Sequence, residues 1–422
     1  MDVFHIEGPV QIGGAVSING SKNASLPIMA ATILASGSSV LKSVPHLSDI
    51  SVFSELLEQL GCRVARGENG DLRIDSTVVD NPVGDYEIVR RMRASICILG
   101  PLLGRCGRAK VSMPGGCSIG DRPVDIHIRA LSELGAKIHL ENGYIVAEAP
   151  QALTGREIFL GGPFGSTVLG TANVLMAAVL ARGRTVIESA ACEPEISDLA
   201  NCLNKMGAKI KGIGSPRLIV EGVRCLQPAE YEVTADRIEA GTFMVAAAIT
   251  AGQLKLTNCR LDDMMAVVDK LRHIGVTVEP AESGCIVARK GPIRPADITT
   301  QPYPGFPTDL QAQFMALLSL AQGNSVVIEK VFPDRFMHVA ELNRMAANLR
   351  KEGPAVIVTG VHKLIAAPVM ASDLRASAAL VLAGLAAEGT TTIQRVYHID
   401  RGYERIERRL NKLGAKIRRQ SI

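Results

Sequence analysis

The chain has 422 residues, a length that at roughly 150 residues per domain predicts two or three domains with ample core. Hydrophobic residues make up 47% and charged residues 21%, as in an ordinary globular protein. The formal net charge is only +4, tryptophan is absent, and lysine and arginine form no dense run, so we expect no nucleic-acid partner.

The nine cysteines are an odd number and show no Cys-x-x-Cys spacing. This argues against a disulfide framework or a zinc site and favours a reducing compartment. The first residues lack a basic leader, and the longest apolar run, 376–387, is too short to span a bilayer. We therefore expect a cytoplasmic protein with no membrane partner.

An amphipathic helix that ends in an apolar residue and a small residue, followed by a short strand, recurs about every 70 residues. Such a period predicts repeated supersecondary units. The six copies reach this point at Gly61, Gly135, Gly207, Gly275, Ala346 and Gly414.

A second set of six helices is apolar nearly all round and is therefore predicted to be buried. These helices are expected at 24–36, 94–103, 168–182, 238–251, 310–322 and 374–388. Each is followed by a glycine that would suit a C-terminal cap. These glycines are Gly37, Gly104, Gly183, Gly252, Gly323 and Gly389.

Polar and charged residues gather at the starts of the buried helices. Some of them, such as Thr308 and Asp373, would serve as N-caps. Lysine and arginine at a helix N-terminus oppose its dipole, which favours an anionic ligand, but plain solvated charges are the alternative. The residues are Lys22, Asn23, Arg91, Arg93, Ser166, Thr167, Asp236, Arg237, Glu239, Thr308, Asp309, Asp373 and Arg375.

Six units in two groups of three predict two similar α/β domains. We expect the first at 22–232, and the second to combine 1–21 with 233–422. A cleft between domains is a preferred position for a ligand.

Cys117 lies in a glycine-rich loop, Gly115-Gly116-Cys117-Ser118-Ile119-Gly120, that precedes a predicted helix. The N-terminus of a helix favours anions and lowers the pKa of a nearby thiol. The alternative is a buried structural cysteine beside an ordinary turn. His127 follows, but it is expected to pack or to cap, so we predict no Cys–His dyad.

Several short strings stand in a characteristic order along the whole chain. They are Ser21-Lys22-Asn23-Ala24, Arg91-Met92-Arg93-Ala94-Ser95, the Cys117 loop with Arg122-Pro123-Val124-Asp125, Glu193-Pro194-Glu195, Asp236-Arg237-Ile238-Glu239-Ala240-Gly241-Thr242, Pro304-Gly305-Phe306-Pro307-Thr308-Asp309, Arg335-Phe336-Met337-His338, Ser372-Asp373-Leu374-Arg375-Ala376 and Asp400-Arg401-Gly402-Tyr403. Together they resemble the UDP-N-acetylglucosamine enolpyruvyl transferase family.

The resemblance implies two inside-out α/β domains, each of three repeated units with buried parallel helices and outer sheets. It implies transfer of the enolpyruvyl group of phosphoenolpyruvate to the 3′-hydroxyl of UDP-N-acetylglucosamine, through a tetrahedral ketal and with release of phosphate. That reaction opens peptidoglycan precursor synthesis. The resemblance also implies a monomer that needs no metal and no cofactor.

The resemblance assigns roles to individual residues. Cys117 resembles the general acid, and Asp309 the base or the group that orients the sugar hydroxyl, although a Pro-Thr-Asp sequence alone would predict a helix cap. Lys22, Arg122 and Arg401 resemble the phosphate clamp. The phosphoenolpyruvate pocket would add Asn23, Arg335 and Arg375. The nucleotide-sugar contacts would be Arg93, Arg122, Pro123, Val124, Asp125, Ile126, Asp309 and Val331.

Three departures from the family pattern stand out. The segment 165–173 differs from the Ser-Val-Gly-Ala-Thr type that contributes uridine and phosphate contacts, so contacts from this region stay open. His46 occupies a position where lysine is common, and Ala346 replaces the glycine of the repeat.

Two other functions remain to be distinguished. One is 5-enolpyruvylshikimate-3-phosphate synthase, which shares the fold but lacks the loop cysteine and the Pro-Gly-Phe-Pro-Thr-Asp string. The other is a catalytically idle relative that only binds a sugar nucleotide.

Overall fold

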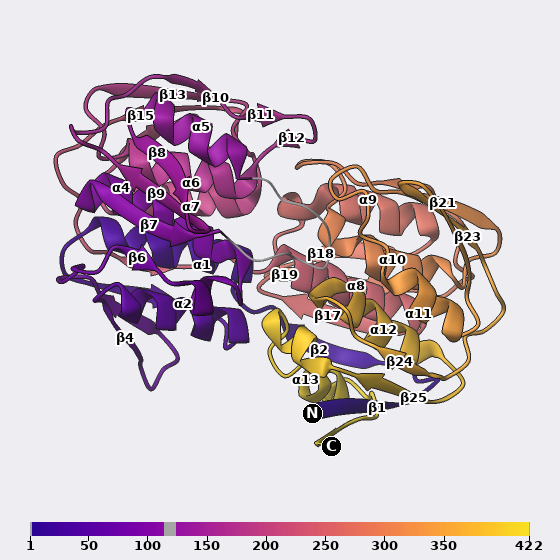
Figure 1. Ribbon diagram of the computed structural model, residues 1–422. Helices are drawn as coiled ribbons and strands as arrows, with labels where there is room; N and C mark the ends of the chain where they lie inside the picture. The colour runs from indigo at the N-terminus through magenta and orange to yellow at the C-terminus, as the bar shows by residue number, and fades with distance from the viewer. Residues whose placement is uncertain (1, 114–123, 422) are drawn as a thin grey trace. The chain divides into compact units, whose positions relative to one another are not determined.

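The chain folds into two units, each with its own hydrophobic core. The computed structural model describes residues 2–113 and 124–421. Of these, the N-terminal unit contains 20–113 and 124–234, and the C-terminal unit contains 2–19 and 235–421. Figure 1 shows the indigo strands β1 and β2 among the orange and yellow elements of the C-terminal unit.

The described part of the N-terminal unit contains three four-stranded sheets and a short β-ribbon. In each four-stranded sheet one edge pair is parallel and the other pairs are antiparallel. In sheet order the strands are β16 (Glu230–Glu232), β3 (Ser38–Lys42), β5 (Leu72–Asp75) and β4 (Arg63–Arg66); β6 (Val83–Gly84), β7 (Arg108–Ser112), β9 (Tyr144–Glu148) and β8 (Lys137–Glu141); β10 (Glu157–Phe159), β13 (Arg184–Glu188), β15 (Arg217–Glu221) and β14 (Lys209–Lys211); with the ribbon β11 (Gly161–Gly162) and β12 (Gly165–Ser166).

The described part of the C-terminal unit repeats this pattern, again with one parallel edge pair in each of three sheets. In sheet order the strands are β18 (Thr277–Ala281), β19 (Gly284–Ala288), β17 (Gln253–Thr257) and β2 (Gly13–Ser17); β20 (Ile298–Thr299), β21 (Asn324–Ile328), β23 (Ala355–Thr359) and β22 (Asn348–Glu352); β24 (Pro368–Met370), β25 (Gly389–Gln394), β1 (Asp2–Gly8) and β26 (Ile417–Ser421).

The apolar helices form the core of each unit, because nearly every face of them is buried. In the N-terminal unit they are α1 (Lys22–Ala31) continued by the 3₁₀ turn η1 (Thr32–Leu34), η2 (Arg93–Ile98) continued by α4 (Leu99–Cys106), and α6 (Val168–Ala178). In the C-terminal unit they are α8 (Arg237–Ile249), η4 (Thr308–Leu310) continued by α10 (Gln311–Leu318), and α12 (Leu374–Ala386).

Amphipathic helices lie between the core and solvent. They are α2 (Ser48–Gln59), α5 (Asp125–Glu133), α7 (Pro194–Lys205), α9 (Met265–Ile274) after η3 (Leu261–Met264), α11 (His338–Arg344) and α13 (Ile406–Lys412), with the short α3 (Tyr86–Val89) and η5 (Val396–Arg401). None of the helices in the described part of the chain is long and apolar enough to cross a lipid bilayer. The predicted mixed α/β class with repeated units is confirmed.

The prediction that a glycine caps each buried helix was wrong, because none of the six glycines is the C-cap of its helix. Gly104 lies inside α4, which ends at Gly107 with φ of 69°. A Cβ at Gly104 would make only ordinary contact, 3.5 Å from the Met176 backbone oxygen, whereas one at Gly100 would lie 2.1 Å from the Asn173 backbone oxygen, so it is Gly100 that lets α6 pack closely against α4. Gly252 does not take up a positive φ, whereas Ala251 before it does. The other four glycines have positive φ several residues beyond their helices.

The turn after each surface helix is where the sixfold repeat is most regular. Five glycines there have φ between 102° and 105°, namely Gly61, Gly135, Gly207, Gly275 and Gly414. Ala346 occupies the sixth turn with φ of 65°. An alanine in this left-handed region is strained by its Cβ. Alanine in place of the glycine of the repeat therefore lowers the stability of the fold and does not only alter where the helix ends.

We therefore predict that Ala346→Gly stabilises the protein. Relief of the left-handed strain contributes about 1–2 kcal/mol, and the greater freedom of glycine in the unfolded chain offsets about 0.4–1 kcal/mol of it. Urea unfolding should show a higher midpoint for the variant. Gly414→Ala, in the same unit with ordinary space for a Cβ, should shift the midpoint down; equal midpoints for all three proteins would contradict the strain argument.

Candidate functional site

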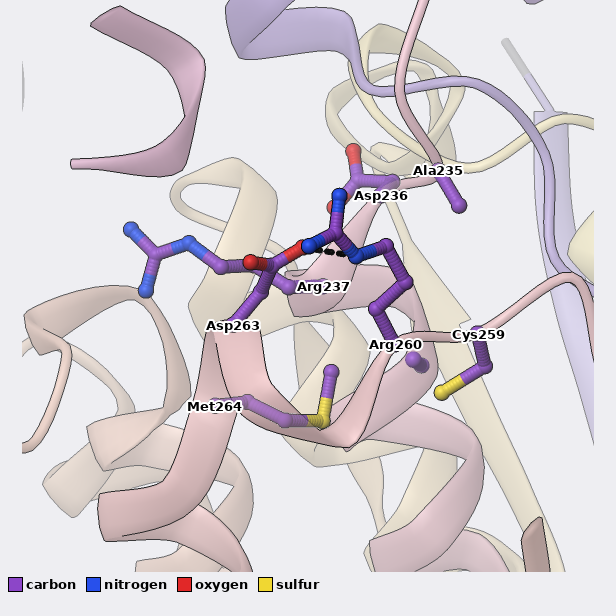
Figure 2. A pocket seen from close by; sticks show the side chains of 8 residues that line it. Ala235, Asp236, Arg237, Cys259, Arg260, Asp263 and Met264 are labelled. Carbon is purple, nitrogen blue, oxygen red and sulfur yellow. Dashed lines mark ion pairs between the residues drawn. The ribbon is translucent and has the colours of Figure 1, made fainter. Parts of the chain in front are cut away.

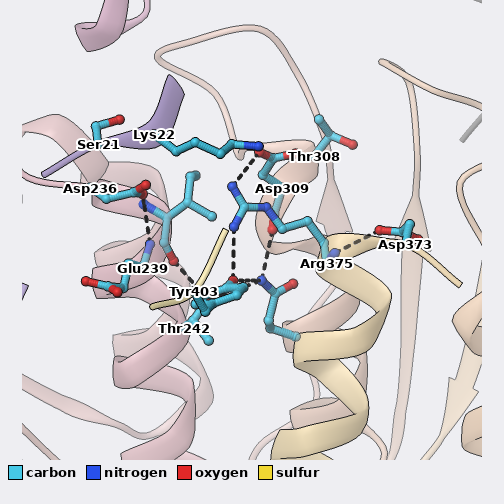
Figure 3. Close-up of polar contacts among 12 residues, drawn as sticks. Ser21, Lys22, Asp236, Glu239, Thr242, Thr308, Asp309, Asp373, Arg375 and Tyr403 are labelled. Atoms are coloured by element: carbon cyan, nitrogen blue, oxygen red, sulfur yellow. Dashed lines mark hydrogen bonds and ion pairs between the residues drawn. The ribbon is translucent and has the colours of Figure 1, made fainter. Parts of the chain in front are cut away.

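Asp309 in η4 contacts two arginines of the C-terminal unit: Arg375 at the start of α12 (Figure 3) and Arg335 in the loop before α11. Its Oδ1 accepts a hydrogen bond from Arg335 Nη1 at 2.8 Å, and its Oδ2 accepts one from Arg375 Nη2 at 3.0 Å. The side chains of Arg335 and Arg375 are 7% and 2% exposed, while that of Asp309 keeps 25%. The carboxylate is thus the most accessible member of this cluster.

The helix-cap interpretation of this segment is wrong. No side chain caps η4, and the Asp309 carboxylate bonds to the arginines. Thr308 is not a cap either, because its hydroxyl donates to Glu329 Oε2 at 2.9 Å. Asp373 does cap its helix, since its Oδ1 accepts from the backbone N–H groups of Arg375 and Ala376.

Tyr403 holds the other side of the Arg375 guanidinium. Its hydroxyl oxygen accepts from Arg375 Nη1 at 3.1 Å and from Gln313 Nε2 at 3.3 Å, and it contacts Thr242 Oγ1 at 2.8 Å. The Thr242 hydroxyl donates to the Ile238 carbonyl, so the Tyr403 hydroxyl donates to Thr242. Burial raises the pKa of the Tyr403 phenol, which keeps this donor protonated.

The protonation of Arg375 follows from the same contacts. Burial acts to lower the pKa of its guanidinium, but the oxygens of Tyr403 and Asp309 outweigh this and raise it overall. Arg375 is therefore a permanent cation that the surrounding side chains hold in one orientation.

The remaining predicted residues of the C-terminal unit lie in two other segments. Arg401 is the last residue of η5, two positions before Tyr403. Asp400 beside it accepts two hydrogen bonds from Arg419 in β26, which fixes this segment to the sheet. Val331 lies in the loop after β21, and its backbone N–H donates to Glu329 Oε1 at 2.8 Å.

In the N-terminal unit, Lys22 and Asn23 open helix α1 after the N-cap Ser21. Lys22 is 9% exposed, and its Nζ lies 3.2 Å from Oδ2 of the buried Asp49 in α2. The pair fixes the ammonium at the N-terminus of α1, where the helix dipole also favours an anion. Lys22 is thus a positioned cation rather than a solvated one.

Arg93 opens η2, and Val124, Asp125 and Ile126 lead into α5. His127 follows Ile126 in α5, and burial, with the charge of Arg93, lowers its pKa to about 4. His127 Nδ1 contacts the Asn173 amide at 3.0 Å, as expected for a packing residue. Cys117, Arg122 and Pro123 lie outside the described residues.

The sequence departs from the family pattern at the start of α6. The polar side chains there make hydrogen bonds within the N-terminal unit. Thr167 caps the helix through Gly170 N at 3.2 Å. Thr171 Oγ1 donates to the Thr167 carbonyl and accepts from Ala191 N at 3.0 Å. The Asn173 amide accepts from Gly100 N and donates to the Ile96 carbonyl.

Sequence reasoning missed Tyr403, Thr242, Gln313 and Glu329 as members of the cluster around Asp309. Tyr403 belongs to the Asp400-Arg401-Gly402-Tyr403 string, which was the one available signal for it. Thr242 likewise ends the string that begins at Asp236. Gln313 and Glu329 lie in none of the strings, and nothing in their local spacing indicates these contacts.

Cavities and metal ligands do not mark another site. The start of α8 has a hollow with no room for a water molecule, lined by Asp236, Arg237, Cys259, Arg260 and Asp263 (Figure 2). Asp236 and Arg237 belong to the charges at the helix starts, but the resemblance gives none of these five residues a role. Within 2–113 and 124–421, no group of three or more His, Cys, Asp or Glu side chains could hold a metal ion. The charges around Asp309 therefore define the candidate site of the C-terminal unit.

Comparison with known proteins defines the class. Residues 6–410 match the family described as EPSP synthase (3-phosphoshikimate 1-carboxyvinyltransferase). The fold resembles the enolpyruvyl transferase NikO from Streptomyces tendae, with a TM-score of 0.90 at 23% identity over 100% of this chain and 99% of that one. It also resembles EPSP synthase from Acinetobacter baumannii, with a TM-score of 0.76 at 19% identity over the whole of both chains. The chain belongs to the enolpyruvyl transferase family.

Curated relatives narrow the family. UDP-N-acetylglucosamine 1-carboxyvinyltransferase from Methylacidiphilum infernorum is 52% identical over 419 residues, 99% of both chains. The enzymes of that name from Trichlorobacter lovleyi and Gluconacetobacter diazotrophicus are 52% and 53% identical over 100% and 99% of both chains. The predicted resemblance is confirmed, whereas the likeness to EPSP synthase structures extends to the fold alone.

We predict that acid destabilises the N-terminal unit through His127. The Asn173 Nδ2 group donates to His127 Nδ1, so a proton on that nitrogen would face a donor. The folded pKa of about 4 lies below the usual value near 6.5. Stability from this histidine is therefore complete above pH 6.5 and falls toward pH 4, by up to about 3 kcal/mol.

Urea unfolding of the wild type and of His127→Gln between pH 7.5 and 4.5 measures this effect. The unfolding free energy of the variant should fall less steeply with falling pH, because unfolding then takes up about one proton fewer. This difference in slope does not depend on the stability of the variant at pH 7.5. His139→Gln, at an exposed position on β8, is the control and should follow the wild-type slope. Identical slopes for all three proteins would contradict the assignment.

Proposed function

We propose that this protein transfers the enolpyruvyl group of phosphoenolpyruvate to the 3′-hydroxyl of UDP-N-acetylglucosamine and releases phosphate. The observation that supports this most strongly is full-length identity of 52–53% to enzymes named UDP-N-acetylglucosamine 1-carboxyvinyltransferase. The reaction would open peptidoglycan precursor synthesis. The proposal includes a cytoplasmic monomer that uses no metal and no cofactor, as the resemblance implies.

In the proposed addition step, the sugar oxygen bonds to C2 of phosphoenolpyruvate. Asp309 accepts or orients the hydroxyl proton, and Cys117 delivers a proton to C3. The product is a tetrahedral ketal that still carries phosphate. Elimination then breaks the C2–phosphate bond, returns a proton from C3 to the protein and restores the double bond. General acid and base groups contribute about 10²–10⁴-fold each when they are positioned.

Cations are needed because phosphoenolpyruvate carries a phosphate and a carboxylate. Lys22, Arg122 and Arg401 are proposed to hold the phosphate. Asn23, Arg335 and Arg375 would line the same pocket, where a planar guanidinium can pair with either anion through two hydrogen bonds. The fixed orientation of Arg375 between Asp309 and Tyr403 supports this role.

The nucleotide sugar is proposed to contact residues from four segments. These residues are Arg93, Arg122, Pro123, Val124, Asp125, Ile126, Asp309 and Val331. Phosphate release with both substrates separates this enzyme from a relative that only binds the sugar nucleotide. Shikimate-3-phosphate in place of the sugar nucleotide separates it from an EPSP synthase.

We predict that Asp309→Ala lowers kcat by at least about 100-fold, because the base for the sugar hydroxyl is lost. Phosphate release under saturating substrates is the measurement, with circular dichroism to establish that the fold is kept. Asp269→Ala removes an exposed carboxylate from α9 of the same unit and should keep wild-type kcat. A near-normal rate in folded Asp309→Ala would remove Asp309 from the mechanism.

We also predict that Cys117→Ser suppresses product formation and abolishes any covalent adduct on the protein. A hydroxyl is a far weaker acid than a thiol and does not add to phosphoenolpyruvate in its place. Intact mass after incubation with phosphoenolpyruvate, with and without the sugar nucleotide, is the measurement. Cys225→Ser, at an exposed cysteine, is the control. An adduct that persists in Cys117→Ser but disappears in the control would assign the thiol chemistry elsewhere.

A further inference from the structure

Glu329 is a fully buried carboxylate directly after strand β21. Its Oε1 accepts hydrogen bonds from Thr300 Oγ1 at 2.7 Å and from the backbone N–H groups of Val331 and Phe332 at 2.8 and 2.9 Å. Its Oε2 accepts from Thr308 Oγ1 at 2.9 Å. Four donors on one buried side chain are enough to compensate its removal from water.

One branch of this network leads to Asp309. Thr308 has a single hydroxyl hydrogen, which it gives to Glu329, so its oxygen is left to accept from Arg335 Nη1 at 3.1 Å. The same Nη1 donates its other hydrogen to Asp309 Oδ1 at 2.8 Å. The direction of every bond from Glu329 to Asp309 is thereby determined.

The other branch fixes the turn that contains Val331. Glu329 accepts hydrogen bonds from two consecutive N–H groups of this turn, those of Val331 and Phe332. Phe332 also contacts Arg335: the Phe332 carbonyl accepts from Arg335 N at 2.9 Å, and the Phe332 ring centre lies 5.9 Å from Arg335 Cζ. Both branches therefore meet at Arg335. The Glu329 carboxylate therefore holds both the turn and, through Thr308, the Arg335 guanidinium.

We propose that Glu329 is a positioning residue, which sets the orientation of the Arg335–Asp309 pair through Thr308 and the place of the Val331 backbone through the turn. This inference rests on the proposed function, because it is Asp309 and Val331 that are proposed to meet the nucleotide sugar. Glu329 acts through these residues and touches neither substrate.

Glutamine replaces Glu329 only in part. With its oxygen at the Oε1 position, the amide keeps the hydrogen bonds from Thr300, Val331 and Phe332. Its nitrogen at the Oε2 position is a donor, so Thr308 has to turn its own hydrogen away and accept from the amide, and the bond to a charged carboxylate is lost. Glu329→Gln thus weakens and reorients the branch to Asp309 and keeps the turn, whereas Glu329→Ala removes both.

The experiment measures phosphate release and compares kcat with the KM for UDP-N-acetylglucosamine. Glu329→Gln should lower kcat by about 10- to 100-fold, the cost of a displaced catalytic group, with KM changed less than about threefold. Glu329→Ala should lower kcat as much and also raise KM by about tenfold or more. A variant that is only less stable would show no such division between the two parameters.

Variants of Thr308 test the same branch and keep the inference testable even if Glu329→Ala fails to fold. Thr308→Val should reproduce the kcat loss of Glu329→Gln, and the double variant should be no worse than either, because both break one chain of bonds. Thr308→Ser retains the hydroxyl and should recover most of the lost activity. Additive losses, or equal rates in Thr308→Ser and Thr308→Val, would overturn the inference.

Asp297→Asn is the matched control, since the exposed Asp297 carboxylate also holds a backbone N–H, that of Val326 at 2.8 Å, beside the same sheet. It should keep wild-type kcat and KM. An active wild type with an equally active Glu329→Gln variant would overturn the positioning role alone, whereas a wild type that releases no phosphate would overturn the proposed function.

Crystal structures of the wild type and of Glu329→Gln test the same inference without turnover. The contact of 3.1 Å between Thr308 Oγ1 and Arg335 Nη1 should open beyond about 3.5 Å in the variant. An unchanged contact would overturn the inference.

Discussion

The carboxylate of Asp309, shared by Arg335 and Arg375, is the interaction on which the C-terminal unit depends. A guanidinium that is almost fully buried needs partners for its hydrogens, since an unpaired buried charge costs several kcal/mol. Asp309 supplies one partner from the start of α10, and Tyr403 supplies the other for Arg375. Through Tyr403 the network reaches Thr242 in α8. The starts of α8, α10 and α12 must therefore meet at one place.

This constraint excludes one interpretation of the charges at the helix starts, that of plain solvated charges, for Arg375. Arg375 is not a solvated charge, because its side chain is 2% exposed and its guanidinium bonds to two residues. Asp373, in contrast, is a plain cap. Local sequence could not separate the two cases, because the partners of Arg375 lie 66 and 28 positions away along the chain. The resemblance to a family supplied the proposed role of Asp309, whereas spacing alone would have predicted a helix cap.

Much of the fold was predictable because its repeat depends on one local requirement. The turn after each surface helix needs a positive φ, and glycine at five of the six turns makes the period visible in the sequence. The ends of the buried helices were less predictable, since apolar residues continue into the turns and strands that follow. The predicted helix 310–322 ends at Leu318, and the predicted helix 94–103 begins as a 3₁₀ segment and extends to Cys106. The apolar pattern of these segments reflects burial, and residues remain buried after the helix has ended, so the pattern does not indicate the last helical residue.

At the start of α6, the sequence alone did not show whether polar side chains serve the fold or a ligand. Thr167, Thr171 and Asn173 are polar residues in a segment that departs from the family pattern, and the sequence alone presents them as candidates for ligand contacts. The structure uses the Thr167 oxygen for a cap, Thr171 to hold Ala191, and both ends of the Asn173 amide to join η2, α4 and His127. Both donor hydrogens of this amide and one lone pair of its oxygen are thus engaged within the unit. The polar side chains of Thr167, Thr171 and Asn173 therefore serve the start and the packing of a buried helix, a use that the sequence of this segment did not indicate.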